Sequence, residues 1–240
     1  MKIAVIGSGA VGRTLAGRLA GLGHDVAVGT RDVRKTLAVD EAGASGTPPY
    51  RDWQQEHPTA QLLSFRGAAA FGEIVLNAVN GMNALAAMRS IGADTLAGKV
   101  LLDLALPLDL SDGFPPSLVI ANTDSLSEQI QSALPDTRVV KSLNTVYMAV
   151  MVDPARVPGD HNLFLSGNDA QAKQVVRELL QQFGWPAERL LDLGGLETAR
   201  GVEMYSGLFF SLHGRLGTFD FNIAVTHADG LTSSTKEEEP

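Results

Sequence analysis

The chain has 240 residues, a formal net charge of −8 at pH 7 and no cysteine. The negative charge argues against nucleic acid as a partner, and the lack of cysteine excludes disulfides, thiolate metal ligands and cysteine nucleophiles. No apolar run reaches the ~18 residues of a membrane span, so no membrane association is expected. The first residues predict a core strand rather than a signal peptide, which favours a cytoplasmic protein.

The first 35 residues predict a β-loop-α-β unit. Residues 2–6 form a short apolar run, typical of a buried parallel strand, and a glycine loop follows at once. Apolar residues then recur at helical spacing up to Gly23, and residues 25–28 predict a second strand. This order of elements is that of a dinucleotide-binding unit.

The glycine loop fits the pattern G-x-G-x-x-G. Gly7 permits a tight turn, Gly9 lets a pyrophosphate approach the backbone, and Gly12 lets the helix lie close to the strand. The helix N-terminus supplies free N–H groups and partial positive charge for phosphates. An ordinary glycine turn is the alternative. The residues predicted to contact the cofactor here are Gly7, Ser8, Gly9, Ala10, Val11 and Gly12.

The end of the second strand favours NADP(H) over NAD(H). An NAD-selective enzyme usually has Asp or Glu there, bound to the ribose 2′-hydroxyl, whereas this chain reads Gly29-Thr30-Arg31. Thr30 and the Arg31 guanidinium can hold a phosphate, and Lys35 shares their face if a helix starts near Asp32, which suits an N-cap. Thr30, Arg31 and Lys35 are therefore the predicted 2′-phosphate site, with a solvated basic cluster as the alternative.

The chain up to residue 150 alternates strands with helices, which predicts an α/β fold. This pattern is typical of a Rossmann-type, doubly wound parallel sheet with helices on both faces. A loop is expected over 105–116, which holds three prolines. Strands are predicted at 61–65, 74–79, 99–104 and 138–143, and helices at 50–57, 67–71, 82–91 and 124–134.

Turns rich in proline and glycine mark a change of pattern near residue 153. Beyond it, strands are predicted at 161–166 and 189–193, an amphipathic helix at 169–183, and one or two helices over 196–216. The predicted organisation is an NADP-binding Rossmann domain at 1–150, a small C-terminal α/β domain at 151–229 that completes the cleft and the interface, and a disordered acidic tail at 230–240.

Residues that follow successive strands are expected to line a cleft. Doubly wound sheets bind ligands beyond the carboxyl ends of their strands, which adds Val79 and Asn80 to the predicted cofactor contacts. The predicted substrate pocket consists of Ala105, Pro107, Asn144 and Thr145. Asn144 and Thr145 can hydrogen-bond a carboxamide, or they can cap the turn after the strand.

Other polar and apolar candidates have structural interpretations. Lys141 is a conceivable proton donor, but a strand lysine with its head group at the surface is expected instead. His213 is expected to serve packing or an interface, and the five histidines show no ligand spacing, so no metal site is predicted. The apolar stripe from Met204 to Leu216 is interpreted as core or dimer interface rather than cofactor contact.

The chain resembles the coenzyme F420-dependent NADP oxidoreductase family. The resemblance is carried by IGSGAVGRTLAGRLAGLGHDVAVGTRD at 6–32, DLALPLD at 103–109, VVKSLNTV at 139–146, LFLSGND at 163–169 and GGLETARGVEMY at 194–205. It implies a Rossmann domain and a small C-terminal domain that together form a cleft for a deazaflavin over the nicotinamide. It also supports the 2′-phosphate site. This chain has Asn80 where members commonly have Pro, and Leu106-Pro107 where relatives tend to read Asn-Pro, so the second substrate stays open.

The predicted function is hydride transfer between NADP(H) and a deazaflavin (F420) or flavin-like acceptor. Cofactors carry such chemistry, so no catalytic side chain is assigned. The alternatives are an imine or 2-keto acid reductase of the hydroxyacid dehydrogenase type, and a non-catalytic NADPH-binding sensor. A homodimer is expected, with the C-terminal helix at its interface.

Overall fold

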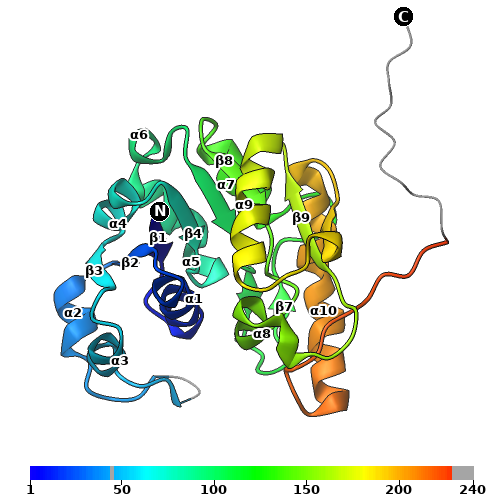
Figure 1. Ribbon diagram of the computed structural model, residues 1–240, viewed down its shortest axis with the longest axis horizontal. Helices are drawn as coiled ribbons and strands as arrows, with labels where there is room; N and C mark the ends of the chain where they lie inside the picture. The colour runs from blue at the N-terminus through cyan, green and yellow to red at the C-terminus, as the bar shows by residue number, and fades with distance from the viewer. Residues whose placement is uncertain (44–45, 229–240) are drawn as a thin grey trace, which may run out of the picture.

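A computed structural model describes residues 1–43 and 46–228 (Figure 1). Eight strands form one sheet in the order β10-β9-β8-β5-β4-β1-β2-β3. All neighbours in it run parallel except β8 and β9, which pair antiparallel. The strands are β1 (Lys2–Ile6), β2 (Asp25–Thr30), β3 (Gln61–Ser64), β4 (Ile74–Asn77), β5 (Val100–Asp103), β8 (Arg138–Lys141), β9 (Leu163–Gly167) and β10 (Leu190–Asp192).

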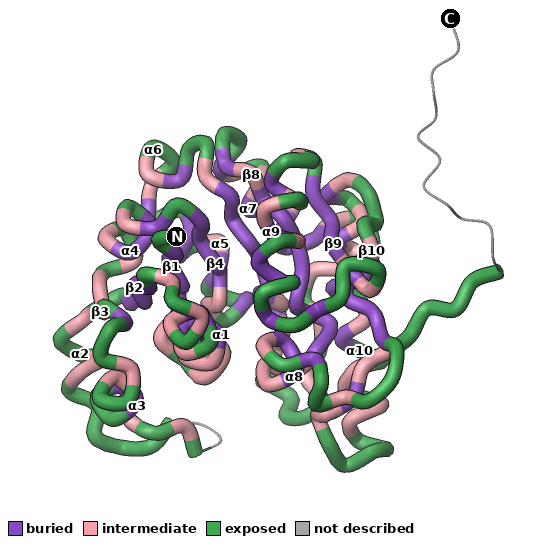
Figure 2. The backbone as a smooth tube through the Cα atoms, in the orientation of Figure 1, coloured by how far each residue is buried: buried purple, intermediate pink, exposed green. Residues whose placement is uncertain are grey.

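Helices cover both faces of this sheet, and a separate apolar cluster fills the space on each side. One layer contains α1 (Ala10–Gly21), α3 (Tyr50–Glu56), α8 (Met148–Val152) and α9 (Ala170–Gln182). The other contains α4 (Phe65–Phe71), α5 (Gly81–Ile91), α6 (Ala93–Leu96) and α7 (Leu126–Ala133). In the tube view the central strands are buried along their length (Figure 2). The prediction of a Rossmann-type α/β fold is confirmed.

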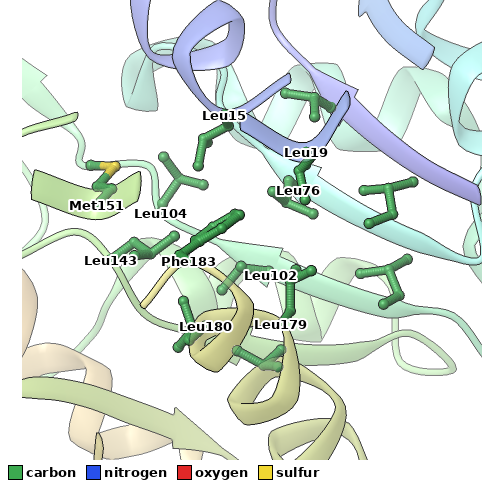
Figure 3. Close-up of a cluster of buried hydrophobic side chains, with 14 of the residues drawn as sticks. Leu15, Leu19, Leu76, Leu102, Leu104, Leu143, Met151, Leu179, Leu180 and Phe183 are labelled. Atoms are coloured by element: carbon green, nitrogen blue, oxygen red, sulfur yellow. The ribbon is translucent and has the colours of Figure 1, made fainter. Parts of the chain in front are cut away.

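The core is continuous between the N-terminal and C-terminal parts of the chain. Leu15 and Leu19 of α1 share one buried cluster with Leu179 and Leu180 of α9 (Figure 3). Phe183, at the C-terminal end of α9, is also fully enclosed there. Burying large apolar side chains from both parts stabilises their packing by roughly 1.5–3 kcal/mol per side chain.

The segment predicted as a loop over 105–116 holds the first strand of a small hairpin, whose second strand follows directly after it. Its strands are β6 (Leu108–Asp109) and β7 (Ser117–Leu118), paired antiparallel. Each strand has only two residues, too few for an alternating pattern to show in the sequence. The expected helix over 196–216 begins with a 3-10 turn at Leu196–Thr198 and continues as α10 (Ala199–Leu216). The short helices α2 (Val33–Ala38) and α8 complete the fold.

The predicted boundary at residue 150 does not interrupt the sheet. β9 pairs with β8, and β10 extends the sheet by one more strand. The division into two domains stays a prediction, and the pairing of β8 with β9 crosses the predicted boundary. The acidic tail at 230–240 lies outside the described residues. Over the described part of the chain, no helix is long and apolar enough to cross a bilayer.

Candidate functional site

The glycine loop lies where the sheet reverses its winding, between β1 and β4. Gly7 has a φ of +128°, and its N–H donates to Gly29 at 2.9 Å. A Cβ on Gly12 would lie 1.9 Å from the Gly7 carbonyl oxygen, so only glycine permits this approach of α1. A Cβ on Gly9 would meet no protein atom within 4 Å. The space in front of Gly9 is therefore open, as a phosphate cradle requires.

Arg13 braces this loop from the first turn of α1. Its Nε donates to the Ser8 carbonyl oxygen at 2.8 Å, and its Nη1 donates to the Pro48 carbonyl oxygen. The guanidinium also lies over the ring of Tyr50, 5.1 Å from its centroid. Arg13 thus holds the glycine loop against α3 through hydrogen bonds and its contact with Tyr50. The sequence pattern alone does not indicate this role.

A cavity of about 960 Å³ extends from the glycine loop across the ends of β2 and β3. The predicted 2′-phosphate residues Thr30, Arg31 and Lys35 all line it, as do Ser64 and Arg66. Among the described residues, neither the Arg31 nor the Lys35 side chain has an ion-pair partner. Two free cations at one end of a cavity suit a phosphate dianion.

Thr30 is less available than its neighbours. It is 6% exposed, and its hydroxyl shares a 2.7 Å hydrogen bond with the Thr36 hydroxyl. Asp32 caps α2 by accepting from the Lys35 N–H at 3.0 Å, which confirms the expected N-cap and fixes the start of the helix that carries Lys35.

A second cavity of about 480 Å³ adjoins the first and is mainly apolar. The two share Gly9, Ala78, Val79 and Asn80, so they meet at the glycine loop. We call the first the outer cavity and the second the inner cavity. The inner cavity is also lined by Ala10, Val11, Gly81, Leu104, Ala105, Leu106, Leu108, Leu110, Asn144, Val146, Tyr147, Met148, Met151, Ser206, Phe209, Phe210 and Phe219.

The predicted substrate residues divide into two pairs. Ala105 and Asn144 line the inner cavity, whereas Pro107 and Thr145 do not line either cavity. Pro107 packs behind the turn at Gly81, where a Cβ would lie 2.5 Å from the proline nitrogen. Thr145 is 2% exposed, so its side chain points into the protein. The Asn144 amide donates to the Val202 carbonyl oxygen at 2.9 Å, which ties the turn after β8 to α10.

Aromatic rings from three segments close the inner cavity. Tyr147 stacks on Phe219 with centroids 4.8 Å apart, and His213 stacks on the same ring at 3.6 Å. Phe114 of the hairpin loop meets Phe210 of α10 edge to face at 5.4 Å. His213 therefore serves packing, as expected.

The apolar residues of α10 lie on two faces of the helix rather than on one. Phe209 and Phe210 line the inner cavity, so part of the stripe faces a cavity, and its interpretation as core or dimer interface rather than cofactor contact stays a prediction. Met204 and Leu208 point outward and are 40% and 55% exposed. Helical periodicity places these residues near one another but does not show which neighbour each one faces.

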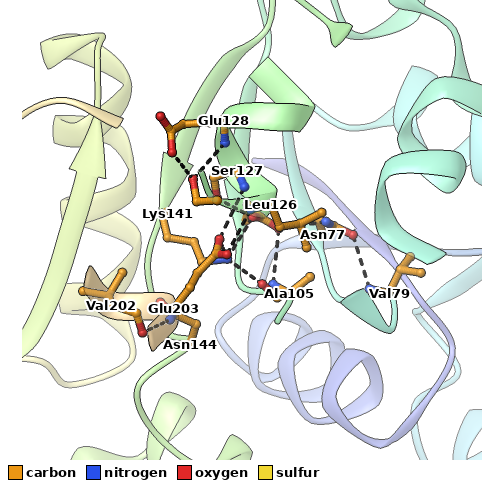
Figure 4. A network of polar contacts seen from close by, with 12 residues as sticks. Asn77, Val79, Ala105, Leu126, Ser127, Glu128, Lys141, Asn144, Val202 and Glu203 are labelled. Carbon is orange, nitrogen blue, oxygen red and sulfur yellow. Dashed lines mark hydrogen bonds and ion pairs between the residues drawn. The ribbon is translucent and has the colours of Figure 1, made fainter. Parts of the chain in front are cut away.

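Lys141 is buried completely, so the expectation of a head group at the surface is wrong. Its Nζ lies 3.0 Å from Asp103 Oδ2 and 2.8 Å from Glu203 Oε1, and it donates to the Ala105 carbonyl oxygen (Figure 4). Burial alone would lower the pKa of Lys141, but the charges of Asp103 and Glu203 outweigh it and raise that pKa. The amine thus stays protonated and fully engaged, which removes it as a proton donor to substrate.

Glu203 joins α10 to the N-terminus of α7. Its carboxylate accepts from the Leu126 N–H at 2.9 Å and the Ser127 N–H at 3.3 Å. Burial raises the pKa of Glu203, and Lys141 opposes that shift. The Ser127 hydroxyl donates to Asp103 at 2.5 Å. A signal for one member of this cluster lies in the sequence, because Asp103 ends β5, whose other residues are apolar.

The fold places the chain among the Rossmann-type nucleotide-binding proteins. Residues 2–107 match the family model described as NADP oxidoreductase, coenzyme F420-dependent. A solved structure from Arthrobacter sp. FB24, described provisionally as an F420-dependent NADP reductase, is 50% identical with a TM-score of 0.89 and covers 95% of this chain and 100% of its own. The chain belongs to the F420-dependent NADP oxidoreductase family and is an NADP-dependent oxidoreductase.

Two curated relatives match at lower identity. The F420-dependent NADP reductase of Methanocaldococcus jannaschii is 28% identical over 231 residues, which cover 95% of this chain and 100% of the relative. Metalloreductase STEAP3 of Rattus norvegicus is 29% identical over 202 residues, covering 84% of this chain and 36% of the relative. The resemblance to the first thus spans a whole protein, and the resemblance to the second spans one part of a longer one.

Proposed function

We propose that this protein transfers a hydride between NADP(H) and coenzyme F420, with the two ligands side by side in the joined cavities. The observation that carries the proposal is the junction of the two cavities at Gly9, Val79 and Asn80. The outer cavity offers a phosphate cradle and two cations, Arg31 and Lys35, that have no ion-pair partner among the described residues. The inner cavity offers apolar and aromatic surface of the kind that holds a planar ring.

The outer cavity fits NADP(H). Open space in front of Gly9 suits the pyrophosphate at the N-terminus of α1, and Arg31 and Lys35 suit the 2′-phosphate. Val79 and Asn80, which line both cavities, are proposed to lie beside the nicotinamide end. The bound dinucleotide supplies the hydride, so the protein needs to align and desolvate rather than to donate protons.

The inner cavity is proposed as the acceptor site. Phe209, Phe210 and Phe219 belong to the proposed C-terminal domain at 151–229, which thereby completes the cleft. Ala105 and Asn144, which follow β5 and β8, line the same cavity, and we call the part formed by Val79 and Ala105 its floor. Aromatic side chains exclude water from the hydride path and favour stacking with a deazaflavin ring. The same surface suits the ring of a flavin, which makes flavins the competing acceptors.

The imine or 2-keto acid reductase alternative needs a placed proton donor. Tyr147 is the only titratable side chain among the described residues that line the inner cavity. Tyr147→Phe is therefore a discriminating variant. Hydride transfer to a deazaflavin should fall less than about tenfold, because water can supply the proton to the reduced ring, whereas an imine or keto acid reductase should lose about 100-fold or more.

The test of the proposed function is direct. The pure protein is mixed with NADPH and oxidised F420, FMN or FAD, and the absorbance of each acceptor is followed. Rapid reduction of F420 alone supports the proposal, whereas preference for FMN or FAD assigns a flavin. Tight NADPH binding with no turnover of any acceptor would instead indicate the sensor.

We further propose that the protein is a cytoplasmic homodimer. The exposed Met204 and Leu208 on α10 support the dimer.

A further inference from the structure

We propose that the buried cluster of Asp103, Lys141 and Glu203 is the positioning centre of the acceptor site, fixing the floor of the inner cavity relative to its aromatic wall. The inference rests on the proposed function of that cavity. These residues end β5, end β8 and lie in α10, so the cluster joins three elements that are distant in sequence (Figure 4). None of the three side chains lines either cavity.

The cluster holds the floor through backbone groups. Asp103 Oδ1 accepts from the Ala105 N–H at 3.2 Å, and Lys141 donates to the Ala105 carbonyl oxygen. Asn77 extends the network, since its amide donates to Asp103 at 2.8 Å and its Oδ1 accepts from the Val79 N–H at 3.3 Å. Ala105 and Val79 both line the inner cavity. Two floor residues thus have their peptide groups fixed by the cluster.

The cluster holds the wall through α10. Glu203 bonds Lys141 and the N-terminus of α7, and it lies one to two turns before Ser206, Phe209 and Phe210, which line the inner cavity. A helix is stiff over two turns, so anchoring it at Glu203 sets where the aromatic rings stand. Among the described residues, no side-chain hydrogen bond or ion pair joins Thr30, Arg31 or Lys35 to the cluster. Damage to the cluster should therefore disturb acceptor alignment and leave the 2′-phosphate end of the outer cavity intact.

The experiment compares three substitutions. Glu203→Leu removes the anchor, and Glu203→Gln retains an oxygen that can accept from Lys141 or from α7. Glu128→Gln is the matched control, because Glu128 also links α7 to α10, through a bidentate pair with Arg200 at the protein surface. Three quantities are measured: the NADPH dissociation constant by fluorescence, kcat and KM with F420, and amide hydrogen exchange over 199–216.

The expected result is a split between the two cavities. Glu203→Leu should lower kcat with F420 about tenfold to a hundredfold and speed exchange in α10, while the NADPH dissociation constant changes less than threefold. Glu203→Gln should recover most of kcat while exchange in α10 stays somewhat faster than in the wild type. Glu128→Gln should match the wild type in kcat and in NADPH affinity, with a smaller change in exchange than Glu203→Leu. Equal effects of Glu203→Leu and Glu128→Gln, or a parallel loss of NADPH affinity, would overturn the inference.

Failure of the proposed function is distinguishable from failure of the inference. An inactive wild type would reject F420 as the acceptor, and the exchange measurement would still test the anchor. If Glu203→Leu does not fold, Glu203→Gln decides: faster exchange in α10 with NADPH affinity unchanged supports the inference. Unchanged exchange in both variants overturns it.

Discussion

At the scale of single residues, three glycines of one motif meet three different physical requirements. Gly7 adopts a positive φ, Gly12 lies against a carbonyl oxygen, and Gly9 faces empty space. The sequence pattern predicts these roles because the motif fixes both the spacing and the neighbouring elements. Substitution of each glycine should therefore fail in a different way.

Gly9→Ala and Gly12→Ala should separate binding from stability. The Gly9 methyl meets no protein atom, so the free energy of unfolding should stay within about 0.5 kcal/mol of the wild type. NADPH binding should weaken about tenfold or more, because the methyl occupies the phosphate space. Gly12→Ala forces a shift of α1 or the loop and should cost about 1–3 kcal/mol of stability. Urea unfolding and NADPH titration measure both; a destabilised Gly9→Ala would contradict the assignment.

Arg31 should determine the choice of cofactor. Its side chain has no partner among the described residues and lines the outer cavity. Arg31→Ala should weaken NADPH binding by about 1.5–3 kcal/mol, the scale of a charge-assisted contact, while NADH binding barely changes. Arg34→Ala is the control, since Arg34 is exposed on α2, close to Arg31, but does not line the cavity. Equal losses for both dinucleotides would reject the 2′-phosphate site.

Lys141 shows where residue-level prediction stops. A strand of a parallel sheet is buried on both faces, so its sequence pattern does not say where one lysine points. The answer depends on Asp103 and Glu203, which are 38 and 62 residues away in the chain and arrive only through packing. Their charges compensate the desolvation of the amine, and no local signal encodes such a partnership.

At the scale of elements, the strands and most helices up to residue 104 were predictable because the glycine motif and apolar runs mark them, whereas the four-residue helix α6 was not predicted. The hairpin of β6 and β7 was not, because two-residue strands carry no period. The orientation of α10 was also not predictable, because the sequence does not show that Phe209 faces the inner cavity. Both elements contribute to the lining of the inner cavity, so the outline of that cavity depended on the tertiary structure.

The pairing of α7 with α10 should make stability depend on pH in one direction. The hydrogen bonds from Arg200 and then Ser125 hold the pKa of Glu128 below its usual value, against partial burial. A lowered folded pKa contributes stability above the unfolded value of about 4.3, and this contribution is lost as pH falls through the folded pKa. Glu128→Gln should therefore cost about 0.5–1 kcal/mol at pH 7, the scale of a surface pair.

This difference should shrink when unfolding by urea is repeated at pH values that fall below the unfolded value of about 4.3 and on through the lowered folded pKa, because below both values the carboxylate is protonated in both states. Asp136→Asn serves as a control for general charge effects, because Asp136 has no side-chain ion pair among the described residues. A gap between wild type and Glu128→Gln that widens in acid would contradict the pairing as the cause.

At the scale of the whole molecule, the outward face of α10 predicts self-association. Met204 and Leu208 are exposed there, and Leu110, Phe114 and Val119 of the hairpin are exposed as well. Light scattering at micromolar concentration should give twice the monomer mass of 25.4 kDa. Leu208→Glu should dissociate the dimer, since the charge would be buried without a partner.

Val39→Glu provides the matched control, because Val39 is similarly exposed but lies at the end of α2. It should leave the mass unchanged. A monomer for the wild type would reject the dimer, and dissociation by Val39→Glu would place the interface elsewhere. Substituting Phe209 or Phe210 is a poorer test, because both side chains line the inner cavity.

The unbroken sheet has a consequence for how ligands enter and leave. Sheet hydrogen bonds cross from β8 to β9 at Val140 with Gly167 and at Lys141 with Ser166. Hinged rotation of the C-terminal part against the N-terminal part would break this pairing, so we expect a preformed cleft rather than clamshell closure. Phe210 lines the inner cavity and meets Phe114 edge to face, so we expect ligand access to depend on local movement of these two rings.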